Sequence, residues 1–233
     1  MGRELEVAIP TKDVTLEGTL SMPDVARGVV LFAHGSGSSR FSPRNRWVSH
    51  RLQSAGLATL LMDLLSAEEE QEDLVTRRLR FDIDLLARRL VDAVDWLARI
   101  PETRTLSVGC FGSSTGGAAA LVAAARRPQR VRAVVSRGGR PDLAAEALSK
   151  VRCPTLLVVG GDDTVVLALN QKAQARMECL SRLEVVTGAT HLFEEPGALD
   201  RVADLAAAWF LQHLATEQPA QREERPLRRP SRD

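Results

Sequence analysis

Six short runs rich in apolar residues, each followed by a helical pattern, constrain the fold more than any other feature of this chain. The clearest is residues 28–33, Gly-Val-Val-Leu-Phe-Ala, which contains no polar side chain. A strand that is apolar at every position has to be covered on both faces, as in a parallel sheet with helices on each side. The other runs are residues 58–61, 105–111, 131–135, 154–159 and 183–186. Repeated strand-helix units of this kind predict an α/β fold with a mostly parallel sheet and helices on both faces.

The rest of the chain fits one domain followed by a tail. Residues 4–9 and 14–22 alternate apolar and polar positions around a polar turn, which is typical of a hairpin with one solvated face. No linker rich in proline, glycine or serine divides the pattern, so we expect one domain over residues 1–214. Residues 215–233 are rich in proline and charge without an apolar period, and we expect a disordered tail there.

The longest predicted helix covers residues 74–100, where Ile83, Leu90 and Leu97 belong to one apolar stripe. An acidic run at residues 68–73 precedes it. Because the N-terminus of a helix carries a partial positive charge, such a run is most simply explained as favourable helix-terminal charge.

The composition excludes several classes of partner. The 31 Lys and Arg residues nearly balance the 30 Asp and Glu residues, so neither nucleic acid nor an anionic membrane is indicated. The longest uncharged apolar stretch, residues 118–125, is too short to span a bilayer, and the first residues do not resemble a signal peptide. The three cysteines show no C-x-x-C spacing. We therefore expect a soluble, cytoplasmic protein without a metal, and leave the oligomeric state open, with a homodimer as one possibility.

The sharpest motif follows the run at residues 105–111. Residues 112–116, Gly-Ser-Ser-Thr-Gly, match G-x-S-x-G between a predicted strand and an alanine-rich helix, which is the context of a nucleophile elbow. The turn would present Ser114 at its tip, and the glycines would avoid collisions between strand and helix. The pattern alone also fits an ordinary turn that needs small residues.

A serine hydroxyl needs a base, and the base needs a carboxylate that fixes its tautomer. Of the four histidines, His191 alone lies in a loop after the last predicted strand. That position gives the chain order Ser, Asp, His. The acid should follow the strand at residues 154–159, where Asp162 and Asp163 compete, and the other aspartate would be a turn or helix-cap residue.

The loop His34-Gly35-Ser36-Gly37 follows the first buried strand. It lacks the Walker lysine and the G-x-G-x-x-G spacing of phosphate-binding loops, so we assign it to an oxyanion hole. The backbone N–H groups of Ser36 and Thr115 are the expected donors, and His34 is expected to orient the loop. One such donor contributes about 3 kcal/mol to the transition state.

Together these motifs resemble the α/β-hydrolase superfamily, and within it the dienelactone-hydrolase-like branch. The resemblance covers residues 4–214 and rests on the oxyanion loop, the elbow, Gly160-Gly161-Asp162-Asp163-Thr164-Val165-Val166 and Gly188-Ala189-Thr190-His191. It implies the α/β-hydrolase fold, Asp163 rather than Asp162 as the acid, and ester hydrolysis by Ser114, Asp163 and His191 through an acyl-enzyme without a cofactor. The chain departs from dienelactone hydrolases proper, whose nucleophile is a cysteine.

Two features bear on the substrate. Residues 136–153 leave room for one short helix, so we expect no cap domain and an open site. Five arginines follow the strands near the site, and Arg137 is the candidate to hold a substrate carboxylate; the alternative is that they are solvated surface residues. The arginines are Arg40, Arg44, Arg46, Arg137 and Arg140.

Three functions remain open on the sequence. The first is a serine esterase acting on small carboxylic esters. The second is a thioesterase or acyltransferase with the same triad. The third is a non-catalytic α/β-hydrolase-like binding protein.

Overall fold

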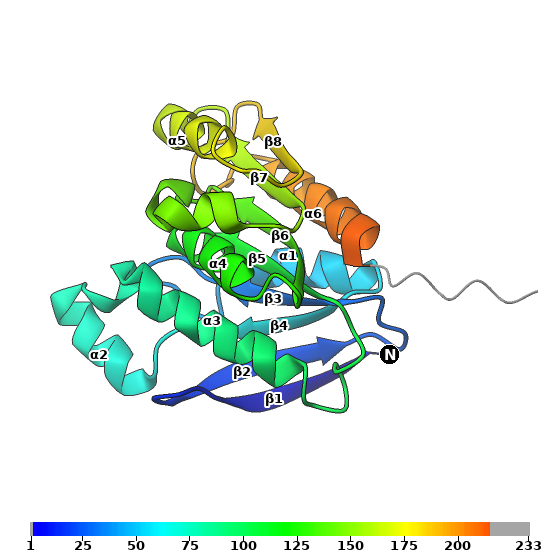
Figure 1. The fold of residues 1–233 in the computed structure, drawn as a ribbon. Coiled ribbons are helices and arrows are strands. Elements are labelled where there is room, and N and C mark those ends of the chain that lie inside the picture. The colour runs from blue at the N-terminus through cyan, green and yellow to red at the C-terminus, as the bar shows by residue number, and fades with distance from the viewer. Residues whose placement is uncertain (1, 215–233) are drawn as a thin grey trace, which may run out of the picture.

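A single mixed sheet organises the chain. The computed structural model describes residues 2–214, so the tail expected at residues 215–233 lies outside the described range. Within that range, 8 strands form a sheet in the order β1-β2-β4-β3-β5-β6-β7-β8 (Figure 1). The strands are β1 (Arg3–Pro10), β2 (Thr15–Met22), β3 (Val29–Ala33), β4 (Ala58–Met62), β5 (Val108–Ser113), β6 (Val131–Arg137), β7 (Thr155–Gly160) and β8 (Ser181–Val186).

The strand directions confirm the prediction of a mostly parallel sheet. All pairs from β4 to β8 are parallel. The predicted hairpin is also present, because β1 pairs antiparallel with β2 in continuous register, and β2 then pairs antiparallel with β4. Every residue of β3, β4, β5 and β7 is buried, as expected for strands covered on both faces.

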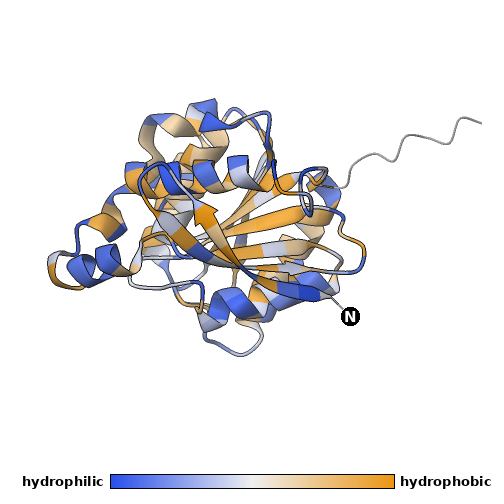
Figure 2. Ribbon diagram, turned by 90° about the horizontal axis from the view of Figure 1, so that it is seen from below, coloured by the Kyte–Doolittle hydropathy of each residue, from blue (hydrophilic) through white to orange (hydrophobic). Residues whose placement is uncertain are grey.

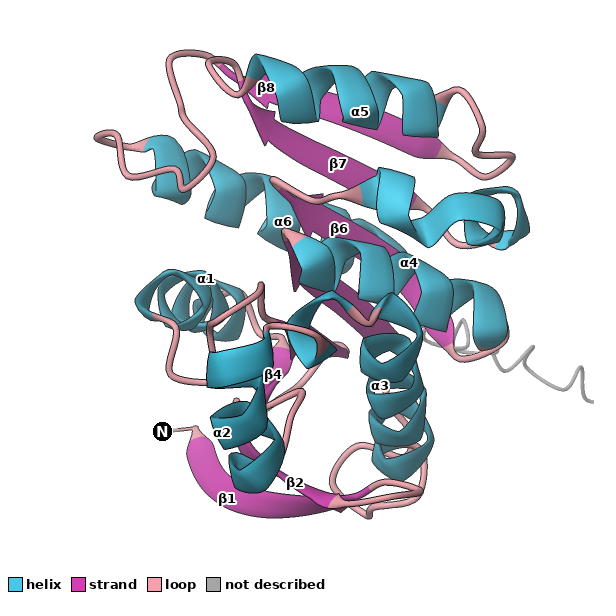
Figure 3. Cartoon of the chain, turned by 90° about the vertical axis from the view of Figure 1, so that its left-hand side faces the viewer, coloured by secondary structure: helices cyan, strands magenta, loops and turns pink. Residues whose placement is uncertain are grey.

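Helices cover both faces of the sheet (Figure 3). Helices α1 (Pro43–Ser54) and α6 (Ala198–Leu214) pack on one face, around Phe32, Phe111 and Phe210. Helices α3 (Ile83–Leu97) and α4 (Thr115–Arg126) cover the other, with the 3-10 segment η2 (Pro141–Lys150) and α5 (Thr164–Gln174) beside them. Figure 2 shows the hydrophobic residues concentrated in the central strands between these layers.

The prediction of one helix over residues 74–100 is wrong. The acidic run lies inside a separate helix, α2 (Ala67–Thr76), which Ser66 and Glu69 begin with a reciprocal capping box. Arg77 adopts a left-handed conformation (φ 56°) and ends α2. A short 3-10 turn, η1 (Leu79–Phe81), follows, and Asp82 caps the start of α3 by accepting from the Leu85 N–H. Three of the acidic residues, Glu68, Glu69 and Glu70, do lie in a first helical turn, but in that of α2.

The carboxyl-end edge of the sheet carries no inserted cap domain between β6 and β7, where η2 is the whole helical content. This agrees with the prediction. Among residues 2–214, no helix combines the length and the apolar character that a bilayer crossing requires.

Candidate active site

Ser114 lies at a sharp corner between β5 and α4. Its backbone has φ 51° and ψ −121°, a conformation that costs a non-glycine residue about 1–3 kcal/mol and persists only where surrounding structure enforces it. A Cβ at Gly112 would overlap the Gly116 carbonyl, and one at Gly116 would overlap the Ala33 carbonyl. The glycines are therefore needed because β5, α4 and the end of β3 approach one another closely.

Neighbouring backbone holds Ser114 in this conformation. Its N–H donates to the Arg137 carbonyl at 3.3 Å, and its carbonyl accepts from the Arg140 N–H at 3.1 Å. The Ser114 side chain is partly exposed, and the residues that the structure describes give its hydroxyl no hydrogen-bond partner. The hydroxyl is thus free to meet a base or a substrate.

Asp163 and His191 are hydrogen-bonded to each other. His191 Nδ1 lies 2.6 Å from Asp163 Oδ2. Because a carboxylate can only accept, Nδ1 carries the proton and Nε2 is left as the free basic nitrogen. The two loops are held together by a backbone bond of 3.0 Å from the Asp162 N–H to the Ala189 carbonyl.

The structure separates the two adjacent aspartates. Asp162 is exposed, whereas the Asp163 side chain is 15% exposed and faces His191. Asp163 also caps α5, since its Oδ1 accepts from the Val166 N–H at 3.4 Å. The other aspartate was expected to be a turn or helix-cap residue, and Asp162 does lie in a turn, which the bond from the Asp163 N–H to the Gly160 carbonyl closes at 3.1 Å. The helix-cap contact belongs to Asp163, so one carboxylate both pairs with His191 and caps α5.

The end of β6 lies close to both His191 and Ser114. A Cβ placed on Gly138 would lie 3.5 Å from His191 Cε1, and the preceding residue, Arg137, accepts the Ser114 N–H. Within the described residues, however, no hydrogen bond joins Ser114 Oγ to the imidazole. The structure therefore forms the Asp–His contact and leaves the Ser–His contact open.

The two residues that carry the candidate oxyanion donors are in side-chain contact. Ser36 Oγ is 3.2 Å from Thr115 Oγ1, which joins the loop after β3 to the first turn of α4. Neither backbone N–H of Ser36 or Thr115 donates a hydrogen bond to any other residue in the described part of the chain. Two unpaired donors beside a helix N-terminus suit an anionic oxygen.

His34 is a structural residue, as expected. It is 7% exposed, and its Nε2 accepts from the Leu64 N–H at 3.1 Å. Nδ1 must therefore carry the proton, which it donates to the Gly35 carbonyl at 3.0 Å. Burial lowers the pKa of His34, so the ring stays neutral and connects the loops after β3 and β4.

Arg137 differs from the other arginines that follow the strands. Arg40 pairs with Asp63 and Glu17, Arg44 pairs with Glu194, and Arg140 pairs with Asp142. The alternative of a solvated surface residue does not hold for Arg137, because it is 7% exposed and its Nε and Nη1 are buried without a partner. Burial, followed by the charge of Arg44, lowers the pKa of Arg137 to about 10, so the guanidinium is still charged near neutral pH.

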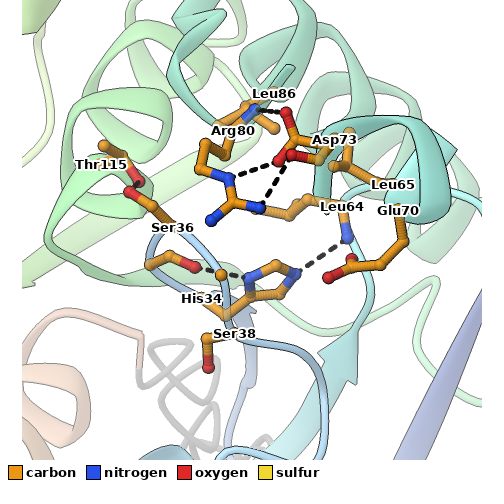
Figure 4. A pocket seen from close by; sticks show the side chains of 12 residues that line it. His34, Ser36, Ser38, Leu64, Leu65, Glu70, Asp73, Arg80, Leu86 and Thr115 are labelled. Atoms are coloured by element: carbon orange, nitrogen blue, oxygen red, sulfur yellow. Dashed lines mark hydrogen bonds and ion pairs between the residues drawn. The ribbon is translucent and has the colours of Figure 1, made fainter. Parts of the chain in front are cut away.

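Two further residues near the candidate site were not predicted from the sequence. Asp73 and Arg80 form an ion pair beside the loop that carries Ser36, in the crevice drawn in Figure 4. No motif marks them, because their meeting depends on the left-handed turn at Arg77 that ends α2. No group of three or more His, Cys, Asp or Glu side chains within residues 2–214 could hold a metal ion.

Comparison with known proteins gives the family. The sequence model described as the dienelactone hydrolase family matches residues 16–215. A solved dienelactone hydrolase from Anabaena variabilis is 60% identical, with a TM-score of 0.90, over 91% of this chain and 99% of that protein. Est1E from Butyrivibrio proteoclasticus, at 16% identity and a TM-score of 0.74 over 89% of this chain and 98% of its own, shares the fold.

Curated relatives add a second name. Proteins from two strains of Mycobacterium tuberculosis are 56% identical to this chain over 218 residues. Their name describes them, provisionally, as phosphoribosyl transferases. The match covers 94% of this chain and 48% of those proteins, so the chain spans about half their length. The family model and the Anabaena structure extend over nearly the whole sheet and its helices. The chain therefore belongs to the dienelactone hydrolase family of α/β hydrolases.

Proposed function

We propose that this chain is a serine esterase that cleaves small carboxylic esters through an acyl-enzyme, without a cofactor. The observation that carries the proposal is the 2.6 Å contact between His191 Nδ1 and Asp163 Oδ2, which leaves Nε2 as the basic nitrogen near a strained, unpaired Ser114. The Ser36 and Thr115 N–H groups would receive the developing negative charge.

The proposed reaction proceeds in two acyl transfers. His191 Nε2 takes the proton of Ser114 Oγ as the oxygen forms a bond to the ester carbon, and the tetrahedral oxyanion is bound by the two N–H groups. The imidazolium then gives its proton to the departing alcohol as the carbon–oxygen bond breaks. Water repeats the sequence on the acyl-enzyme, and the acid is released. A side-chain rotation at Ser114 or a shift of the His191 loop must bring Oγ and Nε2 within about 3 Å in the substrate complex.

The identity of the nucleophile can be tested with class-selective reagents. Cys110 is fully buried, and burial raises its thiol pKa far above the usual range; burial likewise raises the pKa of Cys153 to about 12. Because a thiol reacts as the thiolate, these cysteines should be inert in the folded protein. We expect a fluorophosphonate probe to label Ser114 and abolish ester hydrolysis, while iodoacetamide leaves the activity unchanged. Intact-protein and peptide mass spectrometry would locate the label, and a fully active protein with labelled Ser114 would count against the proposal.

Arg137 is proposed to hold a carboxylate on the substrate. A buried guanidinium without an acceptor is unfavourable, and a bidentate carboxylate would satisfy the unpaired nitrogens. We expect Arg137→Met to lower the preference for a dicarboxylic half-ester over a neutral ester about 10- to 100-fold, the value of one or two hydrogen bonds to a charged group. The measurement is the ratio of kcat/KM values for the two esters.

A matched control is available three residues away. Arg140→Met removes an arginine that already has two hydrogen bonds to Asp142, so the ratio should stay at the wild-type value. An Arg137→Met protein with the wild-type ratio would remove Arg137 from the substrate site and leave the esterase proposal intact.

Two alternative functions can be distinguished from ester hydrolysis by experiment. A thioesterase or acyltransferase would share the triad, and product analysis with a coenzyme A thioester or an alcohol acceptor would separate these reactions from ester hydrolysis. A non-catalytic binding protein would fail to react with the fluorophosphonate. We assign the activity in the name of the M. tuberculosis proteins to the half that this chain does not match.

A further inference from the structure

A crevice behind the candidate oxyanion loop connects that loop to the segment between β4 and α3. Its lining includes Ser36, Gly37 and Thr115 from the oxyanion loop and α4, and Leu65, Asp73 and Arg80 from the segment between β4 and α3. Figure 4 shows the Arg80 side chain between Ser36 and Asp73. Ser114 and His191 do not line it. The crevice therefore lies beside the oxyanion loop and is not lined by the proposed base, and Gly35, which also lines it, lies next to Ser114.

Asp73 holds Arg80 in a fixed orientation across this crevice. Asp73 is 2% exposed, and its Oδ1 accepts from the Leu79 N–H at 2.7 Å and from the Arg80 N–H at 3.2 Å. Arg80 Nε donates to Asp73 Oδ2, and Nη2 donates to the Asp73 carbonyl at 3.1 Å. Burial alone would raise the pKa of Asp73, but the bonds from Arg80 and Leu79 outweigh it, so the carboxylate is charged.

The remaining nitrogen of Arg80, Nη1, lies against Gly37. A Cβ built on Gly37 would be 3.0 Å from Nη1, and Gly37 has φ 64°, which disfavours any side chain there. Within residues 2–214, Nη1 donates no hydrogen bond. Glycine thus permits both the turn of the loop and the close approach of the guanidinium.

The residue that precedes Gly37 in the chain is Ser36, so the Arg80 guanidinium lies close to the oxyanion loop. Ser36 carries one proposed oxyanion donor. Its hydroxyl lies 3.2 Å from the hydroxyl of Thr115, the residue that carries the other donor. Donors of an oxyanion hole stabilise the transition state because they are aimed before the charge develops. A displacement of about 1 Å in such a group can cost about 100-fold in rate.

We propose that Arg80, fixed by Asp73, is a positioning residue that holds the Ser36 N–H in line with the developing oxyanion. The inference rests on the proposed esterase function. Arg80 acts through the Gly37 turn and does not itself touch the substrate. Removing it would weaken binding of the transition state more than binding of the ester.

The test compares Arg80→Gln with Arg78→Gln. Both remove one positive charge from the same segment, but Arg78 is exposed and its side chain forms no ion pair in the described structure. With a neutral ester, we expect Arg80→Gln to lower kcat about 10- to 100-fold with KM within about 2-fold, as expected for a misplaced oxyanion donor. Arg78→Gln should match wild type. Affinity for a trifluoromethyl ketone, which forms the tetrahedral oxyanion with the serine, should fall in proportion to kcat.

A second pair of measurements separates positioning from general loss of structure. Asp73→Asn should also lower kcat, because the amide has no negative charge and only one acceptor oxygen, whereas Asp73 accepts with both of its oxygens. Arg80→Ala should regain part of its kcat when guanidinium ion is added at millimolar concentration. The midpoint of thermal unfolding of this variant should stay above the assay temperature. An unfolded protein would show no such rescue.

The results that would overturn the inference are distinct from failure of the esterase proposal. If wild type is an active serine esterase and Arg80→Gln keeps its kcat within 2-fold, the positioning role is wrong. It is also wrong if the loss is confined to KM or to esters that carry an anionic group. If Ser114→Ala keeps wild-type turnover, the function itself is wrong, whatever Arg80 does.

Discussion

Replacing Ser114 by alanine is expected to lower kcat by at least about 10⁴-fold, as found when the nucleophile of a serine triad is removed. The alanine variant keeps the Ser36 and Thr115 N–H groups, so it should retain substrate binding and a small residual rate. Because the substitution removes a single oxygen that makes no hydrogen bond within the described residues, the fold should be unaffected. The measurement is kcat on a neutral short-chain ester, with folding followed by circular dichroism.

The adjacent serine supplies the matched control. Ser113 is 3% exposed, and its hydroxyl donates to the Ala33 carbonyl at 3.5 Å, on the side of the strand away from solvent. Ser113→Ala should therefore keep kcat within a few-fold of wild type. If Ser114→Ala retained wild-type turnover, or if Ser113→Ala alone abolished it, the elbow would have been assigned to the wrong serine.

The second large effect is expected at Asp163. Asp163→Asn should lower kcat about 10⁴-fold, because an amide no longer selects the tautomer with the proton on His191 Nδ1 and no longer stabilises the imidazolium. Asparagine caps helices about as well as aspartate, so the start of α5 should be preserved. Steady-state kinetics with thermal unfolding would separate the chemical effect from any loss of stability.

Asp162→Asn is the control for this prediction. It makes the same chemical change one residue earlier, at an exposed side chain whose residue contacts the His191 loop only through its backbone N–H. Its kcat should equal that of wild type. Equal losses in both variants would indicate a charge effect of the loop rather than a specific role for Asp163.

Local sequence patterns were sufficient for the order and type of most elements. The apolar runs predicted β3, β4, β5 and β7 because a strand buried on both faces leaves few polar positions. Shorter apolar runs also predicted β6 and β8, although β8 lies at the edge of the sheet and is only partly buried. The alternation at the start predicted the hairpin of β1 and β2 for the complementary reason, that one face meets solvent. The elbow was recognisable because its glycines stand at fixed spacing around the serine. Gly112 is required by the nearby Gly116 carbonyl, whereas Gly116 is required by the distant end of β3.

The same reasoning failed where a short polar segment ends a helix. The apolar stripe of residues 83–97 continues smoothly into the acidic run, and periodicity alone joins them. The break comes from Arg77 in the left-handed conformation and from Asp82 as a cap. Between these two residues, Asp73 accepts the N–H groups of Leu79 and Arg80. Periodicity does not register such contacts because they involve single side chains.

The sequence by itself determined the α/β fold, the elbow at Ser114 and a short set of candidates for base and acid. Only the tertiary structure decided that Asp163 rather than Asp162 meets His191, that Arg137 is buried with two nitrogens unpaired, and that Asp73 and Arg80 form an ion pair beside the loop that carries Ser36. The physical reason is the distance along the chain over which each kind of interaction acts. Helix, strand and turn preferences act over a few residues, whereas each of these contacts depends on how loops from different strands pack at one edge of the sheet.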